Sequence, residues 1–154
     1  MFRNLLNRLT TDDPAPARLS SVESEVAIAA LLVRVARADN AYHDSERARI
    51  DAILARFHNI GADEAAERRA AAEMIEAEAP DTVRFTRQIK DRVVLEERQS
   101  IISAMWEVAL VDSKRDSDEE RLIRLAAGLL GVTDRDSALA RQKVQERLDR
   151  RAQG

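Results

Sequence analysis

The sequence contains no cysteine, and this absence excludes several kinds of site. Disulfides, thiolate nucleophiles and cysteine-ligated zinc sites all need thiols that the chain does not have. Aromatic residues are scarce at 3%, and the chain has only four glycines and three prolines. Alanine, leucine, glutamate and arginine dominate instead, and these residues lose little side-chain freedom in a helix. The composition therefore favours an α-helical protein.

A long hydrophobic run and an excess of charge of one sign are also missing. The longest apolar run, residues 26–33, ends at Arg34 and is far shorter than the roughly 20 residues that a membrane-spanning helix needs. Residues 1–9 lack the apolar core of a signal peptide. Charged residues make up 34% of the chain but interleave to a net charge of −3, so a basic surface for nucleic acid is lacking. We expect a soluble, cytoplasmic protein that binds no nucleic acid.

The chain of 154 residues is long enough for one domain with a hydrophobic core. Residues 1–9 have the periodicity of a short amphipathic helix, and the proline-containing stretch that follows, up to residue 19, is typical of a tether. The helical domain is predicted to span residues 20–150. We expect membrane contact to be at most peripheral, through residues 1–9, because so short a helix offers little apolar area.

Two long segments are apolar on every side and are predicted to be the central, buried helices. The first opens at Ser20 and runs to about Asp39, and the second begins at Leu95. Arg34 and Glu107 occupy equivalent positions on these two helices. We therefore expect an ion pair between them.

The remaining segments also show helical periodicity, and none alternates with the period of two that marks a β-strand. Gly61 and Gly131 each follow an apolar helical stripe, and Gly61 suits a left-handed C-terminal cap. We predict an all-α fold of seven to eight helices. The flanking helices are expected near residues 50–57, 63–79, 83–93, 122–130 and 134–148.

One acidic motif occurs twice in the chain. The sequence around Asp39 reads V-A-R-A-D-N-A-Y-H-D-S-E-R-A-R-I, and the sequence around Asp112 reads V-A-L-V-D-S-K-R-D-S-D-E-E-R-L-I. Glu46 and Glu119 correspond in the same way, and both pairs lie 73 positions apart (112 − 39 and 119 − 46). The motif predicts internally duplicated helical hairpins, one at about residues 20–60 and one at about 95–131.

The position of the two aspartates points to a partner of positive charge. Asp39 and Asp112 each follow a helix C-terminus, where exposed carbonyls make a carboxylate unfavourable by roughly 0.3–1 kcal/mol. A hard cation such as Ca²⁺ or Mg²⁺ would accept both the carboxylates and these carbonyls. The alternative is that the acids only cap helices, because Asp116 with Glu119 forms a capping box and Asp44 can cap the equivalent helix.

The doubled motif resembles the tellurite-resistance TerB family. An apolar helix ends in Ala-Asp, and after a short loop a second helix carries Glu seven positions beyond the Asp and Ile four positions further on. The second half, from Leu95-Glu96-Glu97-Arg98 to Gly131-Val132-Thr133-Asp134, is particularly similar, and the likeness covers roughly residues 20–145. The resemblance implies an all-helical fold around two central hydrophobic helices.

The resemblance also implies a function. Members of the family are associated with tellurite and stress responses rather than with a defined reaction, and their acidic residues are proposed metal ligands. By position, the implied ligands in this chain are Asp39, Glu46, Asp112 and Glu119.

No sequence feature identifies an enzyme. The chain has no Ser-His-Asp or Cys-His set, no glycine-rich phosphate loop and no His-Glu-x-x-His motif. We expect a non-enzymatic stress-response accessory protein that binds a divalent cation, Ca²⁺ or Mg²⁺, and acts through protein partners, with a homodimer as one form of such contact. The alternative is a purely structural or protein-interaction module whose acids are helix caps. A metal-assisted hydrolase ranks third.

Overall fold

A computed structural model describes residues 21–38, 42–78, 82–111 and 117–153 of the chain. These residues form seven α-helices and no strand, so the predicted all-α class is confirmed. The helix and tether predicted before residue 20 lie outside the described residues. The helices are α2 (Ser21–Arg37), α3 (Asp44–His58), α4 (Ala62–Glu78), α5 (Thr82–Arg92), α6 (Leu95–Val111), α7 (Ser117–Leu129) and α8 (Asp134–Gln153).

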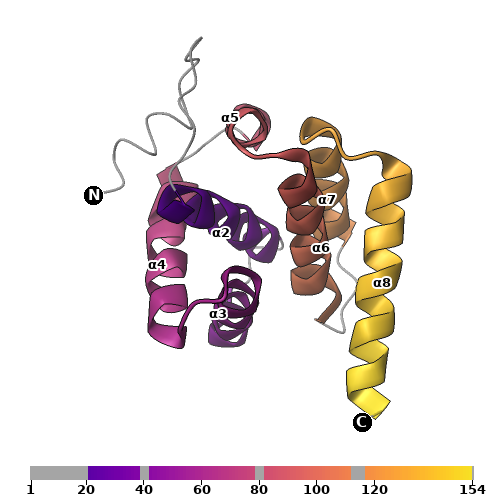
Figure 1. The fold of residues 1–154 in the computed structure, drawn as a ribbon, viewed down its shortest axis with the longest axis horizontal. Helices are drawn as coiled ribbons and strands as arrows, with labels where there is room; N and C mark the ends of the chain where they lie inside the picture. The colour runs from indigo at the N-terminus through magenta and orange to yellow at the C-terminus, as the bar shows by residue number, and fades with distance from the viewer. Residues whose placement is uncertain (1–20, 39–41, 79–81, 112–116, 154) are drawn as a thin grey trace.

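The seven helices form two groups of three, joined by α5 (Figure 1). In the first group α2 packs mainly against α4, and in the second α6 packs mainly against α8. The groups meet where α2 contacts α6 and α7, and where α3 contacts α6. Helices α2 and α6 therefore lie at the centre of the molecule, as the sequence predicts.

The core is built on these two central helices. Every residue of α2 from Val26 to Ala36 is buried, and residues 101–109 of α6 are almost all buried as well. The one tryptophan, Trp106, lies in this core and donates a hydrogen bond from Nε1 to Ser137 Oγ at 3.1 Å. A helix that is apolar all round needs partners on every side, and the neighbouring helices supply them.

Helix starts follow the spacing of the sequence motif. Helix α3 begins at Asp44 and α7 at Ser117, which are 73 positions apart (117 − 44). The order long helix, shorter helix, long helix occurs in both groups. This order agrees with the predicted duplication, which itself stays a prediction.

Two local expectations are wrong. Helix α3 ends in a left-handed residue, but that residue is Asn59, with φ 54° and ψ 50°, and not Gly61. The short polar side chain of asparagine tolerates this conformation, so glycine is not needed there. The expected ion pair between the central helices does not form either. Arg34 pairs instead with Glu76 of α4, and Glu107 pairs with Arg56 of α3.

Candidate functional site

The two central helices end where the acidic loops begin. Helix α2 ends at Arg37 and α6 at Val111. The helix ends therefore lie just before Asp39 and Asp112, as the sequence predicts. Both aspartates lie outside the described residues, and the role predicted for them as metal ligands stays a prediction.

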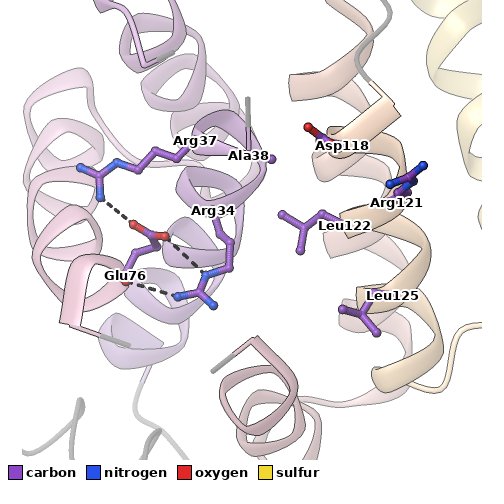
Figure 2. A pocket seen from close by; sticks show the side chains of 8 residues that line it. All are labelled: Arg34, Arg37, Ala38, Glu76, Asp118, Arg121, Leu122 and Leu125. Atoms are coloured by element: carbon purple, nitrogen blue, oxygen red, sulfur yellow. Dashed lines mark hydrogen bonds and ion pairs between the residues drawn. The ribbon is translucent and has the colours of Figure 1, made fainter. Parts of the chain in front are cut away.

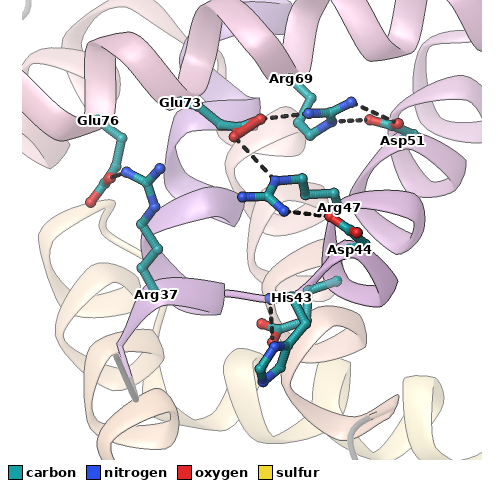
Figure 3. Close-up of polar contacts among 9 residues, drawn as sticks. Arg37, His43, Asp44, Arg47, Asp51, Arg69, Glu73 and Glu76 are labelled. Atoms are coloured by element: carbon teal, nitrogen blue, oxygen red, sulfur yellow. Dashed lines mark hydrogen bonds and ion pairs between the residues drawn. The ribbon is translucent and has the colours of Figure 1, made fainter. Parts of the chain in front are cut away.

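Glu46 lies in the first turn of α3 and helps to cap that helix. His43 is the N-cap residue, and its backbone N–H donates to Glu46 Oε1 at 3.3 Å (Figure 3). Glu46 therefore has a structural role, whether or not it also binds a cation. The expectation that Asp44 is the cap is wrong. Asp44 is the first helical residue, and its carboxylate pairs with Arg47 at 2.7 Å.

Glu119 lies at the equivalent place in α7 but in different surroundings. Both glutamates are the third residue of their helix, yet Glu119 is only 3% exposed whereas Glu46 is half-buried. A carboxylate buried this far must be balanced by hydrogen bonds or by positive charge. The two predicted half-sites are therefore not equivalent.

Carboxylate oxygens are suitable ligands for a hard cation, so the chemistry of Glu46 and Glu119 fits Ca²⁺ or Mg²⁺. Within the described residues there is no cluster of three or more acidic, histidine or cysteine side chains that could hold a metal. A site at either loop would therefore need Asp39 or Asp112 to complete it.

A network of arginines and carboxylates surrounds the start of α3 and joins α2, α3 and α4 (Figure 3). Glu73 of α4 accepts from Arg69 at 2.5 Å and pairs with Arg47 of α3 at 3.5 Å. Arg69 also donates from Nε to Asp51 Oδ1 of α3 at 2.7 Å, and this hydrogen bond raises the pKa of Arg69. From α2, Arg37 pairs with Glu76 of α4 at 2.6 Å. The contacts fix the end of α2 and the start of α3 on one face of α4.

Tyr42, two residues before α3, lies within this network. The guanidinium carbons of Arg37 and Arg47 lie 5.0 and 4.5 Å from the centre of its ring. Such contacts hold a cation against the negative face of an aromatic ring. Burial, together with the charge of Glu73, raises the pKa of Tyr42 to about 12, so the hydroxyl stays protonated. The first acidic loop is thus anchored at its far end by an arginine-rich cluster.

The second half of the chain does not repeat this cluster. At a spacing of 73, the positions of Arg37, Arg47 and Arg69 are occupied by Leu110, Glu120 and Gln142. Sequence reasoning misses the network, because only its local pairs, Asp44–Arg47 and Arg69–Glu73, lie three or four residues apart on one helix. The pairs Arg37–Glu76 and Arg47–Glu73 join residues 39 and 26 positions apart, and only the packing of the helices brings them together.

Comparisons with known proteins identify the family. The described helices include none with the length and apolar character needed to span a membrane. The chain shows no significant similarity to a curated protein or to a solved structure. The sequence model described as Tellurite resistance protein TerB matches residues 25–142, which include both acidic loops and most of the chain. The protein therefore belongs to the TerB family.

Proposed function

We propose that the protein is a non-enzymatic, cytoplasmic accessory protein of the tellurite-resistance type, which binds a divalent cation at its acidic loops and acts through protein partners. Membership of the TerB family over residues 25–142 is the observation that carries the accessory role. The preferred cation is Ca²⁺ or Mg²⁺, since the predicted ligands are all carboxylates. The four ligands are Asp39, Glu46, Asp112 and Glu119.

The positions of the central helix ends support the proposal of a bound cation. Helix α2 ends two residues before Asp39 and α6 ends immediately before Asp112. The last carbonyls of a helix have no partner within it and carry partial negative charge. A cation at either place would satisfy carbonyls and carboxylate together.

Calorimetric titration of metal-free protein with Ca²⁺ and Mg²⁺ tests the proposal, with the melting temperature measured in parallel. A cation that binds only the folded protein stabilises it by about 2.7 kcal/mol at a free concentration of about 100 times Kd. We expect Asp39→Asn and Asp112→Asn each to remove part of the heat and of the rise in melting temperature, and the double variant to remove most of both. Asp91→Asn, at an exposed position on α5, is the matched control. Absence of any heat from the wild type, or an unchanged response in the Asp39→Asn, Asp112→Asn double variant, rejects cation binding.

One observation favours a second candidate, the purely structural or protein-interaction module. The hydrogen bond from the His43 N–H to Glu46 Oε1 is a capping contact and needs no metal. In this case Glu46→Gln lowers the melting temperature by the same amount with and without Ca²⁺. If Glu46 is a ligand, the variant loses more stability in Ca²⁺ than in chelator.

A further inference from the structure

A groove runs between the C-terminal end of α2 and the face of α7 (Figure 2). Its volume is about 450 Å³, and α4 contributes one side chain to its wall. One wall is apolar and the other is charged, as the following paragraphs describe. The groove is lined by Arg34, Arg37, Ala38, Glu76, Asp118, Arg121, Leu122 and Leu125.

The apolar wall belongs to α7. Leu122 extends from α7 across the groove toward the side of Arg34 (Figure 2). Leu125 is one turn further along the helix, and 44% of its surface is exposed. Leu122 and Leu125 therefore give the α7 side of the groove a small apolar surface.

The charged wall belongs to α2 and α4. Two arginines share one carboxylate there: Arg37 Nη1 lies 2.6 Å from Glu76 Oε2, and Arg34 Nε lies 3.4 Å from Glu76 Oε1. Arg34 also donates from Nη2 to the backbone carbonyl of Glu76 at 3.3 Å. The opposite side of the groove, on α7, carries Arg121 and Asp118 beside the two leucines, and their charges are opposite. Among the described residues that line the groove, three guanidiniums against two carboxylates give an excess of positive charge, and it lies on the α2 side, where Arg34 and Arg37 share Glu76.

We propose that this groove is a docking site for a short segment of a partner protein that presents apolar side chains together with an acidic residue. The apolar side chains would cover Leu122 and Leu125, and the carboxylate would face Arg37, whose guanidinium is partly exposed. The inference rests on the proposed function only in assuming a protein partner, and it does not depend on the cation. Residues 1–9 of the chain itself fit poorly, because Arg3 and Arg8 would add positive charge where positive charge is already in excess.

The test uses the full-length protein and a short, fluorescently labelled helical peptide. The peptide carries leucines three and four positions apart on one face and glutamates beside them, which is how a helix presents anchors to a groove. Two further peptides serve as probes, one with every glutamate replaced by lysine and one with the leucines replaced by serine. Binding is measured by fluorescence anisotropy at low and high salt concentrations.

The protein variants are Leu125→Glu and its matched control Leu139→Glu. Leu139 lies on α8, outside the groove, and is exposed to nearly the same extent, 43% against 44%. Circular dichroism and melting curves establish that both variants fold. We expect Leu125→Glu to weaken binding of the acidic peptide at least about tenfold, as loss of one apolar anchor typically does, and Leu139→Glu to leave it unchanged. The lysine and serine peptides should bind more weakly to the wild type, and high salt should weaken the acidic peptide.

Several outcomes would overturn the proposal. They are equal losses in the two variants, equal binding of the acidic and lysine peptides, and no binding by the wild type. A dimer of the wild type that Leu125→Glu dissociates, seen by sedimentation, would instead assign the groove to a second copy of the chain. Leu5→Asp in the full chain would raise the affinity for the peptide if residues 1–9 filled the groove. Calcium titration of Leu125→Glu separates this proposal from the previous one, since the variant should bind cation as the wild type does.

Discussion

His58, the last residue of α3, has a half-buried ring whose Nε2 atom is inaccessible and has no hydrogen-bond partner among the described residues. Burial lowers the pKa of His58, and the charge of Arg68 acts in the same direction. Glu25 of α2 and Glu97 of α6 oppose the shift with their negative charge but do not cancel it. The imidazole is therefore neutral in the folded protein near neutral pH.

This lowered pKa predicts a loss of stability on acidification. As the pH falls through about 6.5, the ordinary pKa of histidine, the unfolded chain takes up a proton that folded His58 does not. The free energy of unfolding therefore decreases from about pH 6.5 down to the folded pKa. Urea unfolding across this range should show a shallower pH dependence in His58→Gln than in the wild type.

The control for this experiment is His43→Gln, at an exposed position on the other end of α3. His43 is the other of the two histidines in the chain. A pH dependence that is as steep in His58→Gln as in the wild type would show that other groups cause the acid sensitivity.

At the scale of single elements, the helix ends show which glycines matter. Gly131 follows the end of α7 with φ 75°, and the Val132 N–H donates to the Ala127 carbonyl at 2.8 Å. These are the features of a left-handed C-terminal cap. Gly61 lies just before α4, has no positive φ, and a Cβ added there would meet nothing within 4 Å.

The two glycines therefore predict different responses to alanine. Gly131→Ala should destabilise the protein by roughly 1–2 kcal/mol, because a Cβ clashes with the backbone in the left-handed region. Gly61→Ala should change stability by less than about 0.5 kcal/mol, because reduced freedom of the unfolded chain and poorer capping of α4 act in opposite directions. Urea unfolding of both variants measures the difference. Equal destabilisation would contradict the cap at Gly131.

At the scale of the whole molecule, a buried carboxylate links the two groups of helices. Glu107 of α6 is 3% exposed and pairs with Arg56 of α3 and, at 3.9 Å, with Arg147 of α8. The two arginine side chains remain about 40% exposed. The carboxylate is therefore buried, whereas water can reach both arginine side chains. Without the arginines the carboxylate would have no compensating charge, but without the carboxylate the arginines could still be hydrated.

This difference in burial predicts which substitution destabilises the protein more. Arg56→Met with Arg147→Met leaves an unpaired, buried carboxylate and should cost about 3 kcal/mol. Glu107→Gln keeps the shape of the side chain and leaves two arginines that water can reach, so its cost should be about 1 kcal/mol. Urea unfolding at neutral pH measures both.

A larger loss in Glu107→Gln than in the arginine double variant would contradict this account.

Much of the fold is predictable from local spacing. The buried centres of α2 and α6, the start of α3 near Asp44 and the end of α7 before Gly131 all follow from periodicity and helix-stop signals. These features depend on interactions between residues a few positions apart, so a short stretch of sequence is enough to predict them. The sequence does not show that Asn59 and not Gly61 is the left-handed residue, because either residue is compatible with a helix end.

The candidate site is predictable only in part. Glu46 and Glu119 do lie at equivalent places in α3 and α7, as the repeated motif indicates. Their different burial is not written in the motif, because burial depends on which helices pack over each position. The same holds for Tyr42, because the burial and the charge of Glu73 that raise its pKa, and the arginines that oppose this shift, come from the packing of separate helices.

Composition and periodicity suffice to predict an all-helical protein, since amphipathicity and apolar runs are local properties of a chain, and the resemblance of the doubled motif points to the TerB family. The packing of the helices alone brings Arg37 to Glu76 and Arg56 to Glu107, and places α7 beside α2 to form the groove. With 25 basic and 28 acidic residues in the chain, almost any pairing is chemically acceptable. Which charges meet is therefore decided by the geometry of the folded core and not by the charges themselves.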